Sequence, residues 1–315
     1  VKKQQISSTL WRYMKDPANN HCTYTSDGFV QFDCNEKADP SKMTLVVNAP
    51  YTSTKVWLKA LLMSGMGSSI AADRIVVNGA TFSLTKADTP ELVLKKRPTD
   101  GVISSGTVTA VTCAGCADES VYFVGTSSLK TGNGIEKVQI SSTYYRFMKA
   151  PANNLCTYTT SGFVQFDCAK SYIDASKMRL IVQSTIKDAS TWGSAEYTVC
   201  TTSDSKLKAT TLEISCGTFN FTSLEVTTLT LNKLPTNGNI NGGNVGQVQC
   251  ASCTSHSVLF VTTSSSITLG TGLGKQQIAA EKWRVMQKTF INDHCTYNGG
   301  FLEFDCQNVA DPSYI

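Results

Sequence analysis

Short runs of alternating apolar and polar residues fill most of this chain, and small turn residues such as Gly, Pro, Asn and Ser separate the runs. Alternation with a period of two predicts half-buried β-strands, as at Met43–Val47 and Met178–Val182. The run Val56–Met63 would also suit a short helix. Its counterpart Trp192–Cys200 alternates as a strand does, so we predict strands at both places. The pattern as a whole predicts an all-β protein.

The pattern returns along the chain at a long period. Cys22–Cys34 reads Cys-Thr-Tyr-Thr-Ser-Asp-Gly-Phe-Val-Gln-Phe-Asp-Cys, and close copies of this segment, the Cys loop, lie at Cys156–Cys168 and Cys295–Cys306. Successive copies begin 134 and 139 residues apart, a period that is long enough for a domain. We therefore predict repeats at residues 1–135, 136–273 and 274–315. The third is partial, and we expect missing sequence or a neighbouring chain to complete it.

The number of strands suggests the fold. Roughly eight to ten short strands in each repeat, bounded by turn residues, are the spacing of a β-sandwich. The predicted fold class is therefore all-β, with tandem, disulfide-stapled β-sandwich domains of about 135 residues that are immunoglobulin-like or jelly-roll-like.

Each repeat opens with an aromatic and basic run, at Leu10–Lys15, Tyr144–Lys149 and Lys282–Gln287. Two charged residues recur at equivalent positions of the three copies: Arg12, Arg146 and Arg284, with Asp33, Asp167 and Asp305. We predict an ion pair between the opening strand and the Cys loop. The recurrent aromatics Trp11, Tyr24 and Phe29 stand at alternating positions, which favours packing in the core over stacking on sugars.

Twelve cysteines recur at matching places, which predicts a disulfide framework made in an oxidising compartment. We therefore expect an extracellular or cell-surface protein. Cysteines that flank one turn should lie opposite each other on antiparallel strands, which pairs Cys22 with Cys34, Cys156 with Cys168 and Cys295 with Cys306. Pairing between repeats is the alternative. Cys200 and Cys216 replace Gly65 and Gly79 of the first repeat together, so we predict that they are partners.

Two C-x-x-C motifs, Cys113 with Cys116 and Cys250 with Cys253, each lie between two predicted strands. The default interpretation is a local disulfide at the end of a hairpin, with disulfides between repeats as a variant. A redox motif would open a helix, and no helix is predicted there. Zinc bound by all four thiolates would require two segments from separate repeats to meet, so it is the weaker alternative.

Charge and motifs exclude several function classes. The net charge of +4 is small, and the lysines are spread along the chain, which argues against a nucleic-acid partner. No apolar run reaches the roughly 18 residues that cross a bilayer. His21 and His294 precede equivalent cysteines, but the second repeat has Leu155 there, so no catalytic set recurs. We expect no enzyme and no cofactor. Asn220 begins a glycosylation sequon, Asn-Phe-Thr.

These features favour a structural protein over a binding or catalytic one. Similar units with short connections form an array whose contacts repeat from neighbour to neighbour. We expect a subunit of an extracellular filament, sheath or surface appendage that associates with itself, with strand addition between subunits as one mechanism. The alternative is an adhesin or receptor stalk that binds carbohydrate or protein. Loops that differ between repeats, such as Asn48–Ser53 and Gln183–Asp188, would suit that role. A secreted hydrolase is a third and weaker alternative.

Overall fold

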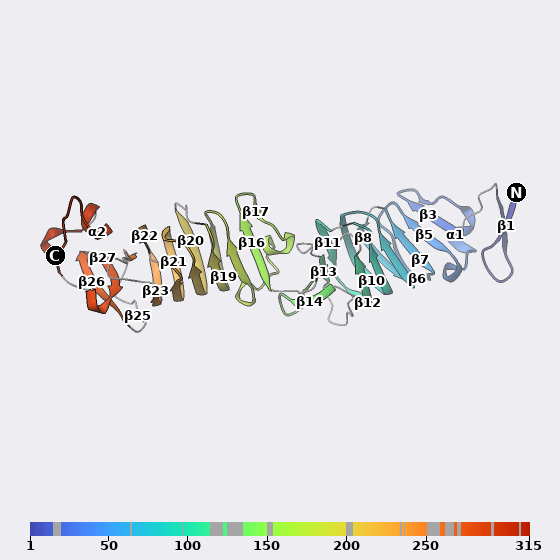
Figure 1. Ribbon diagram of the computed structural model, residues 1–315. Coiled ribbons are helices and arrows are strands. Elements are labelled where there is room, and N and C mark those ends of the chain that lie inside the picture. The colour runs from blue at the N-terminus through green and yellow to red at the C-terminus, as the bar shows by residue number, and fades with distance from the viewer. Residues whose placement is uncertain are drawn as a thin grey trace. The chain divides into compact units, whose positions relative to one another are not determined.

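The computed structural model describes the whole chain apart from residues 15–19, 64, 97, 114–121, 125–134, 150–153, 200–203, 234, 236, 251–258, 262–267, 270–271, 291–292 and 309. Contacts divide the chain into two compact units. Unit 1 comprises Val1–Asn154 and Gln165–Ile173, and unit 2 comprises Leu155–Val164 and Asp174–Ile315. Within each unit most residues lie in β-strands that stack side by side (Figure 1), so the all-β prediction is confirmed.

Unit 1 is built from short strands and a few helical turns. Its strands are β1 (Lys2–Gln5), β2 (Trp11–Met14), β3 (His21–Thr25), β4 (Gly28–Phe29), β5 (Thr44–Val47), β6 (Thr52–Trp57), β7 (Lys59–Leu62), β8 (Gly65–Ala72), β9 (Arg74–Val77), β10 (Thr81–Leu94), β11 (Asp100–Ile103), β12 (Gly106–Cys113), β13 (Tyr122–Val124), β14 (Ile135–Gln139) and β15 (Tyr145–Lys149). Its helices are α1 (Phe32–Glu36) and the 3-10 helices Pro40–Lys42 and Phe166–Ala169.

From β3 onward the chain of unit 1 winds into coils that stack on one another. The strands β3, β5, β7, β9, β10 and β12 pair in parallel, and one column of buried residues runs through them: Cys22, Leu45, Ala60, Ile75, Leu92 and Val111. After Leu45 the successive steps are 15, 15, 17 and 19 residues, so one coil takes about that length.

Two further parallel ladders form the other sides of the unit 1 coils. One joins β6, β8, β10 and β12, and the other joins β8, β10, β11 and β13. On the third side Gly101 pairs with Phe82, and a Cβ at Gly101 would lie 2.6 Å from the phenyl ring. The ring therefore occupies space that only a glycine leaves open. Trp57, Phe82 and Met43 are among the largest fully buried side chains of this core.

Unit 2 repeats this construction. Its strands are β16 (Leu155–Thr159), β17 (Gly162–Phe163), β18 (Arg179–Val182), β19 (Lys187–Tyr197), β20 (Ser205–Ile214), β21 (Thr218–Leu231), β22 (Asn237–Ile240), β23 (Gly243–Cys250), β24 (Leu259–Val261), β25 (Thr268–Leu269), β26 (Leu273–Ala279) and β27 (Lys282–Gln287). Its helices are α2 (Phe304–Asn308) and the 3-10 helices Ala175–Lys177, Lys288–Phe290 and Pro312–Tyr314. Its parallel column is Cys156, Leu180, Ala195, Leu212, Leu229 and Val248.

The architecture is a β-solenoid of stacked coils, so the prediction of tandem β-sandwich domains, immunoglobulin-like or jelly-roll-like, is wrong. A sandwich consists of antiparallel strands, whereas the ladders between these coils are parallel. A strand with one buried face alternates in the same way in either arrangement, and turn residues mark the corners of a coil as readily as they mark hairpins. The predicted repeats 1–135, 136–273 and 274–315 stay a prediction, and we keep them to name equivalent parts of the chain.

Each repeat begins with an antiparallel hairpin, which we call the opening hairpin: β1–β2, β14–β15 and β26–β27. In unit 1, β15 also pairs with β13, the last strand on the third side of the coils. In unit 2, β27 pairs with β24 in the same way. Among the described residues, β2 pairs with β1 alone. Two of the three opening hairpins are thus joined by backbone pairing to the end of the coils that precede them.

The Cys loop departs from the predicted pair of antiparallel strands. β3 and β4 form a hairpin of only two residue pairs, with Gly28 at a φ of +97° in its turn. Cys34 then lies on α1, so its disulfide joins a strand to a helical turn. The strand ends early because the Gln31 side chain takes the place of a ladder partner: the Thr23 backbone N–H donates to Gln31 Oε1 at 2.7 Å.

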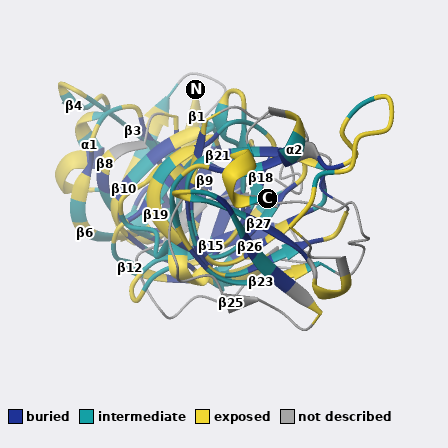
Figure 2. Ribbon diagram, turned by 90° about the vertical axis from the view of Figure 1, so that its left-hand side faces the viewer, coloured by how far each residue is buried: buried dark blue, intermediate teal, exposed yellow. Residues whose placement is uncertain are grey.

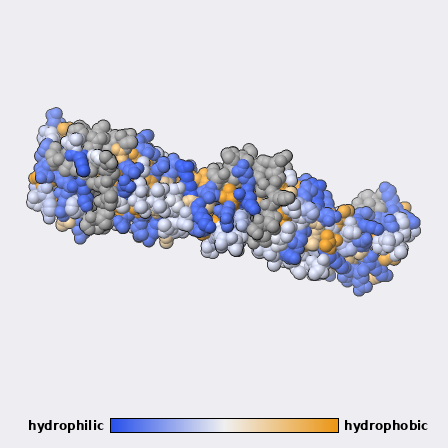
Figure 3. All heavy atoms as spheres, turned by 90° about the horizontal axis from the view of Figure 1, so that it is seen from below, coloured by the Kyte–Doolittle hydropathy of each residue, from blue (hydrophilic) through white to orange (hydrophobic). Residues whose placement is uncertain are grey.

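The surface matches a coil with its apolar side chains inside. Exposed residues lie mostly in turns and outer loops (Figure 2). On the face shown in Figure 3, hydrophilic residues predominate and hydrophobic ones form small patches. The strand prediction for Val56–Met63 is confirmed, since β6 and β7 cover most of it. The prediction that Trp11 belongs to the core is wrong, because its side chain is 46% exposed.

Candidate functional site

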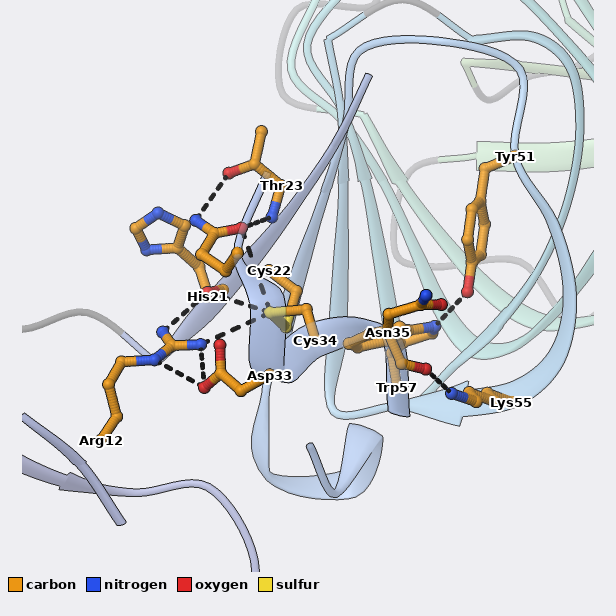
Figure 4. Close-up of a disulfide and its surroundings, with 11 residues drawn as sticks. Arg12, His21, Cys22, Thr23, Asp33, Cys34, Asn35, Tyr51, Lys55 and Trp57 are labelled. Atoms are coloured by element: carbon orange, nitrogen blue, oxygen red, sulfur yellow. Dashed lines mark hydrogen bonds and ion pairs between the residues drawn. A yellow bond between two sulfur atoms is a disulfide. The ribbon is translucent and has the colours of Figure 1, made fainter. Parts of the chain in front are cut away.

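The candidate site of the first repeat lies where the opening hairpin, the Cys loop and the first coil meet (Figure 4). A disulfide joins Cys22 on β3 to Cys34 on α1, and both residues are almost fully buried. In the third repeat Cys295 and Cys306 form the equivalent disulfide. These are two of the pairs that the spacing around the turn predicts.

Arg12 ties the opening hairpin to the Cys loop. Its Nε donates to Asp33 Oδ2 at 2.7 Å, and its Nη1 donates to the backbone carbonyl of His21 at 3.3 Å. Nη2 approaches Cys34 Sγ at 3.4 Å, so the guanidinium lies against the disulfide, as Figure 4 shows. The predicted ion pair is confirmed. In β2 the Arg12 side chain points towards the Cys loop, and its neighbours Trp11 and Tyr13 are exposed.

The same pair is more deeply buried in the later repeats. Arg146 Nε donates to Asp167 Oδ2 at 2.7 Å, and Arg284 pairs with Asp305 in the same way. All four of these side chains are 0% exposed, whereas those of Arg12 and Asp33 are 10% and 18% exposed. Arg146 and Arg284 also donate from Nη2 to Cys168 Sγ and Cys306 Sγ, at 3.1 and 3.2 Å. The contact between arginine and disulfide sulfur therefore recurs in all three copies.

Burial changes the electrostatics of the later copies. Removal from water raises the pKa of the Asp167 carboxyl above its ordinary value, and the adjacent Arg146 guanidinium opposes this shift. Burial raises the pKa of Asp305 for the same reason. A buried guanidinium that keeps its charge needs this carboxylate, because an uncompensated charge in the core is costly.

A concavity of about 480 Å³ lies on the coil side of the first Cys loop. Aromatic rings form part of its wall: Tyr24 packs edge to face on Phe29 and Tyr51, with centroids 5.2 and 4.8 Å apart. The Trp57 Nε1–H donates to Tyr51 Oη at 3.2 Å, which holds that ring in place. On the outer rim Phe32 is 83% exposed.

Polar groups complete the lining of this concavity: Asp27, Gln31, Asn35, Thr52, Ser53 and Lys55. Lys55 Nζ donates to the backbone carbonyl of Asn35 at 2.8 Å, which links the first coil to α1. The second repeat has Ala169, Ile186 and Ser190 at the positions of Asn35, Tyr51 and Lys55. These side chains therefore distinguish the first repeat from the second.

The other predicted cysteines fall partly outside the described residues. Cys156 and Cys168 are each disulfide-bonded, as are Cys113, Cys216 and Cys250. Cys116, Cys200 and Cys253 lie outside the described residues, so the pairs that include them stay predictions. A disulfide sulfur is not the thiolate that zinc requires, so Cys113 and Cys250 do not support the zinc alternative. Within the described residues no group of three His, Cys, Asp or Glu side chains is arranged to hold a metal ion.

The remaining candidates are placed as follows. Asn220 lies on β21, and its Oδ1 accepts a hydrogen bond from Asn241 Nδ2 at 3.1 Å. His21 accepts a hydrogen bond from Arg12 through its backbone carbonyl. Sequence reasoning missed Gln31, although Gln165 stands at the equivalent position and Glu303 replaces it in the third copy. That recurrence was the available signal.

No protein-family model matches this chain, and no curated protein or solved structure matches it either. In the described part of the chain, no helix has the length and apolar character needed to cross a membrane.

Proposed function

We propose that this protein is a non-enzymatic structural subunit of an extracellular filament, sheath or surface appendage, built from tandem disulfide-stapled solenoid repeats. The observation that carries the proposal is the backbone pairing between repeats: β15 continues the ladder of β13, and β27 continues that of β24. A flexible linker would leave neighbouring repeats independent. Backbone hydrogen bonds between strands join each repeat to the next one, as in repeat proteins that are stabilised by contacts between neighbouring repeats.

The Cys loops suit a protein that must last outside the cell. Disulfides of this kind are typical of oxidising compartments. The Cys22–Cys34 disulfide closes a loop with a sequence separation of 12. It restricts the conformations of the unfolded chain and thereby stabilises the folded state by about 3 kcal/mol. A disulfide next to each opening hairpin would stabilise the first coil of each repeat. The ends of a coil stack are the parts of a solenoid that unfold locally most easily.

The third Cys loop offers an exposed surface for contact between subunits. Tyr297 is 70% exposed, and a concavity of about 330 Å³ whose lining includes Phe301 and Pro312 lies in this part of the chain. We propose that a neighbouring subunit contacts the protein at this surface.

Electron microscopy of the native, non-reduced protein tests the proposal. We expect elongated assemblies whose axial repeat matches that of the solenoid repeats, and we expect reductant to weaken them. A Tyr297→Ala variant that shortens the assemblies, beside a Tyr158→Ala variant that does not, would locate the contact at the third Cys loop. A chain that stays monomeric at all concentrations, with no assemblies under any native condition, would contradict the proposal.

A second candidate is carbohydrate binding by an adhesin or stalk, and the concavity of the first repeat favours it. An exposed ring at Phe32 beside the Asn35 amide and the Lys55 ammonium offers the stacking face and hydrogen-bonding groups that sugars require. A glycan array is the first measurement. Binding that is lost in Phe32→Ala but kept in Phe166→Ala, the equivalent change in the second repeat, would support it. Equal binding by both variants would contradict it.

A further inference from the structure

We propose that the outer face of β19 and β20 in unit 2 binds an acidic polysaccharide, with a sulfate or carboxylate group of the ligand held between Lys187 and Lys206. The inference goes beyond the proposed function, because it assigns a ligand to the second repeat and needs no filament. Three observations carry it: two adjacent lysines that have no counter-charge, a bulge beside them, and an adjoining concavity with hydroxyl and amide groups.

The two lysines stand side by side on the sheet. Lys187 on β19 and Lys206 on β20 are paired positions of a parallel ladder, so both side chains leave the sheet on the same side. Both residues are exposed, and neighbouring strands lie about 4.8 Å apart. Among the described residues, neither ammonium group takes part in an ion pair. Like charges at paired positions destabilise a sheet, and an anion between them would relieve this repulsion.

The acidic side chains on the neighbouring coil positions have other partners. Asp188 accepts a hydrogen bond from the Trp192 Nε1–H at 3.0 Å. Glu225 pairs with Lys208, with 2.9 Å between Oε2 and Nζ. Asp204 accepts from a threonine hydroxyl at 3.4 Å. The lysine pair therefore keeps its positive charge.

The first repeat shows that the coil does not need this pair. Thr52 and Ser69 are the paired residues at the equivalent place on β6 and β8. Lys86 follows them on β10, and its Nζ pairs with Asp88 Oδ2 at 2.8 Å. This column of the first repeat thus has one lysine, which has its own counter-charge. Two adjacent lysines without counter-charges are a property of the second repeat, and the fold alone does not explain them.

A bulge in β19 forms a hollow beside the two lysines. Between the paired positions Lys187–Lys206 and Thr191–Lys208, β19 has residues 188–190 whereas β20 has Leu207 alone. Such a bulge bends the strand. A concavity of about 240 Å³ lies there, and both lysines of the pair line it. A sulfate or carboxylate group in this hollow would accept charge-assisted hydrogen bonds from both ammonium groups.

The adjoining concavity indicates what the rest of the ligand is. It has a volume of about 340 Å³ and shares Lys208 with the first one. Thr191, Thr210, Thr227 and Asn244 supply hydroxyl and amide groups to its lining. These groups exchange hydrogen bonds with the hydroxyls of a sugar ring. A peptide has few hydroxyls to offer there, so the two concavities together favour an acidic polysaccharide over an acidic peptide.

Binding of defined polymers to the 315-residue chain tests the proposal. Isothermal titration calorimetry compares dextran sulfate, polygalacturonate and neutral dextran. We expect saturable binding of a charged polymer that weakens with added salt, and no binding of neutral dextran. The tighter of the two charged polymers identifies the anionic group. Changing both lysines of the pair to glutamine should weaken this binding at least about tenfold, because two charge-assisted hydrogen bonds are lost.

Three further variants separate the site from general charge attraction. Lys95→Gln with Lys96→Gln removes the same charge from two adjacent exposed lysines of unit 1, and we expect it to leave binding unchanged. Changing Lys187 and Lys206 to arginine should keep binding, since a guanidinium also donates to anionic oxygens. Thr210→Val with Thr227→Val should weaken polysaccharide binding about threefold or more, because hydrogen bonds to sugar hydroxyls are lost.

Thermal melts check that the glutamine variant of the lysine pair is folded. We expect it to melt no lower than the unmodified protein, because both lysines are exposed and the change removes their repulsion. The charged polymer should raise the melting temperature of the unmodified protein and leave that of the variant unchanged.

Several results would overturn the inference. One is that no charged polymer binds, and another is that the glutamine variant of the lysine pair binds as tightly as the unmodified protein. An equal loss in the Lys95 and Lys96 control would show attraction to overall charge only. Polyglutamate that binds more tightly than both polysaccharides would assign the face to an acidic peptide. Because this binding needs no assembly, absence of filaments would count against the proposed function and leave this result standing.

Discussion

Replacing Asp167 by asparagine isolates the contribution of the buried ion pair. The substitution keeps the shape of the side chain and removes its charge, so the Arg146 guanidinium is left buried without a counter-charge. The matched change is Asp33→Asn, which removes the same group from a pair that water still reaches. The two variants differ in burial and share their sequence context, hydrogen-bond geometry and neighbouring cysteine.

The structure sets the expected magnitudes. At the 2.7 Å separation of Arg146 Nε and Asp167 Oδ2, the gross attraction is about 6 kcal/mol for an effective dielectric of about 20. In the native pair the desolvation cost of the two ions offsets much of this attraction. When Asp167 loses its charge, the desolvation cost of Arg146 remains and no attraction offsets it. Breaking a buried pair costs about 3–5 kcal/mol. At Asp33 solvent screens the remaining charge, so we expect about 1 kcal/mol.

Local opening free energies from hydrogen exchange measure both effects without requiring the whole chain to unfold in one step. We expect the amides of β15 to lose protection in Asp167→Asn, and those of β2 to lose much less in Asp33→Asn. A double variant, Arg146→Met with Asp167→Leu, should be more stable than Asp167→Asn because no buried charge remains. Equal losses in the two asparagine variants, or a double variant that is less stable than Asp167→Asn, would refute this reasoning.

Three other perturbations test the fold. Gly106→Ala should destabilise the coils by at least about 1–3 kcal/mol, measured by chemical denaturation, because Gly106 has a φ of +102° and a Cβ there would meet a backbone carbonyl at 2.2 Å. Replacing Cys22 and Cys34 by serine should cost about 3 kcal/mol in the same assay. The Ser176 hydroxyl lowers the pKa of Asp174, so Asp174 contributes stability that is lost as the pH falls below 3.8. Thermal melts of Asp174→Asn should therefore show a shallower loss of stability in acid.

Local features of this chain could be predicted from its sequence, because they depend on residues that recur. The Arg–Asp pairs followed from their presence in three copies, and the strand at Val56–Met63 followed from comparison of two repeats. The hairpin disulfides Cys22–Cys34 and Cys295–Cys306 followed from spacing alone, although Cys34 lies on a helical turn. Each inference needed only a short segment and its copies.

The solenoid could not be predicted in the same way, because its period is short and irregular. Coil steps of 15, 15, 17 and 19 residues place Leu45, Ala60, Ile75, Leu92 and Val111 in one column. Apolar residues at such varying intervals give no fixed period in the sequence. The longer repeat of the Cys loop is more conspicuous and conceals the shorter coil step. The concavity of repeat one was missed for a related reason: Tyr51 and Lys55 do not recur, so comparison of copies gave no signal for them.

The position of the charged pair connects the fold to the proposed assembly. A solenoid exposes core at both ends, and an opening hairpin covers the end of the preceding coils in the second and third repeats. Where the hairpin is paired the arginine and aspartate are fully buried, and where it is open they are not. A hairpin that covers this pair removes both charges from water, and the buried pair is tolerated because the guanidinium and the carboxylate neutralise each other.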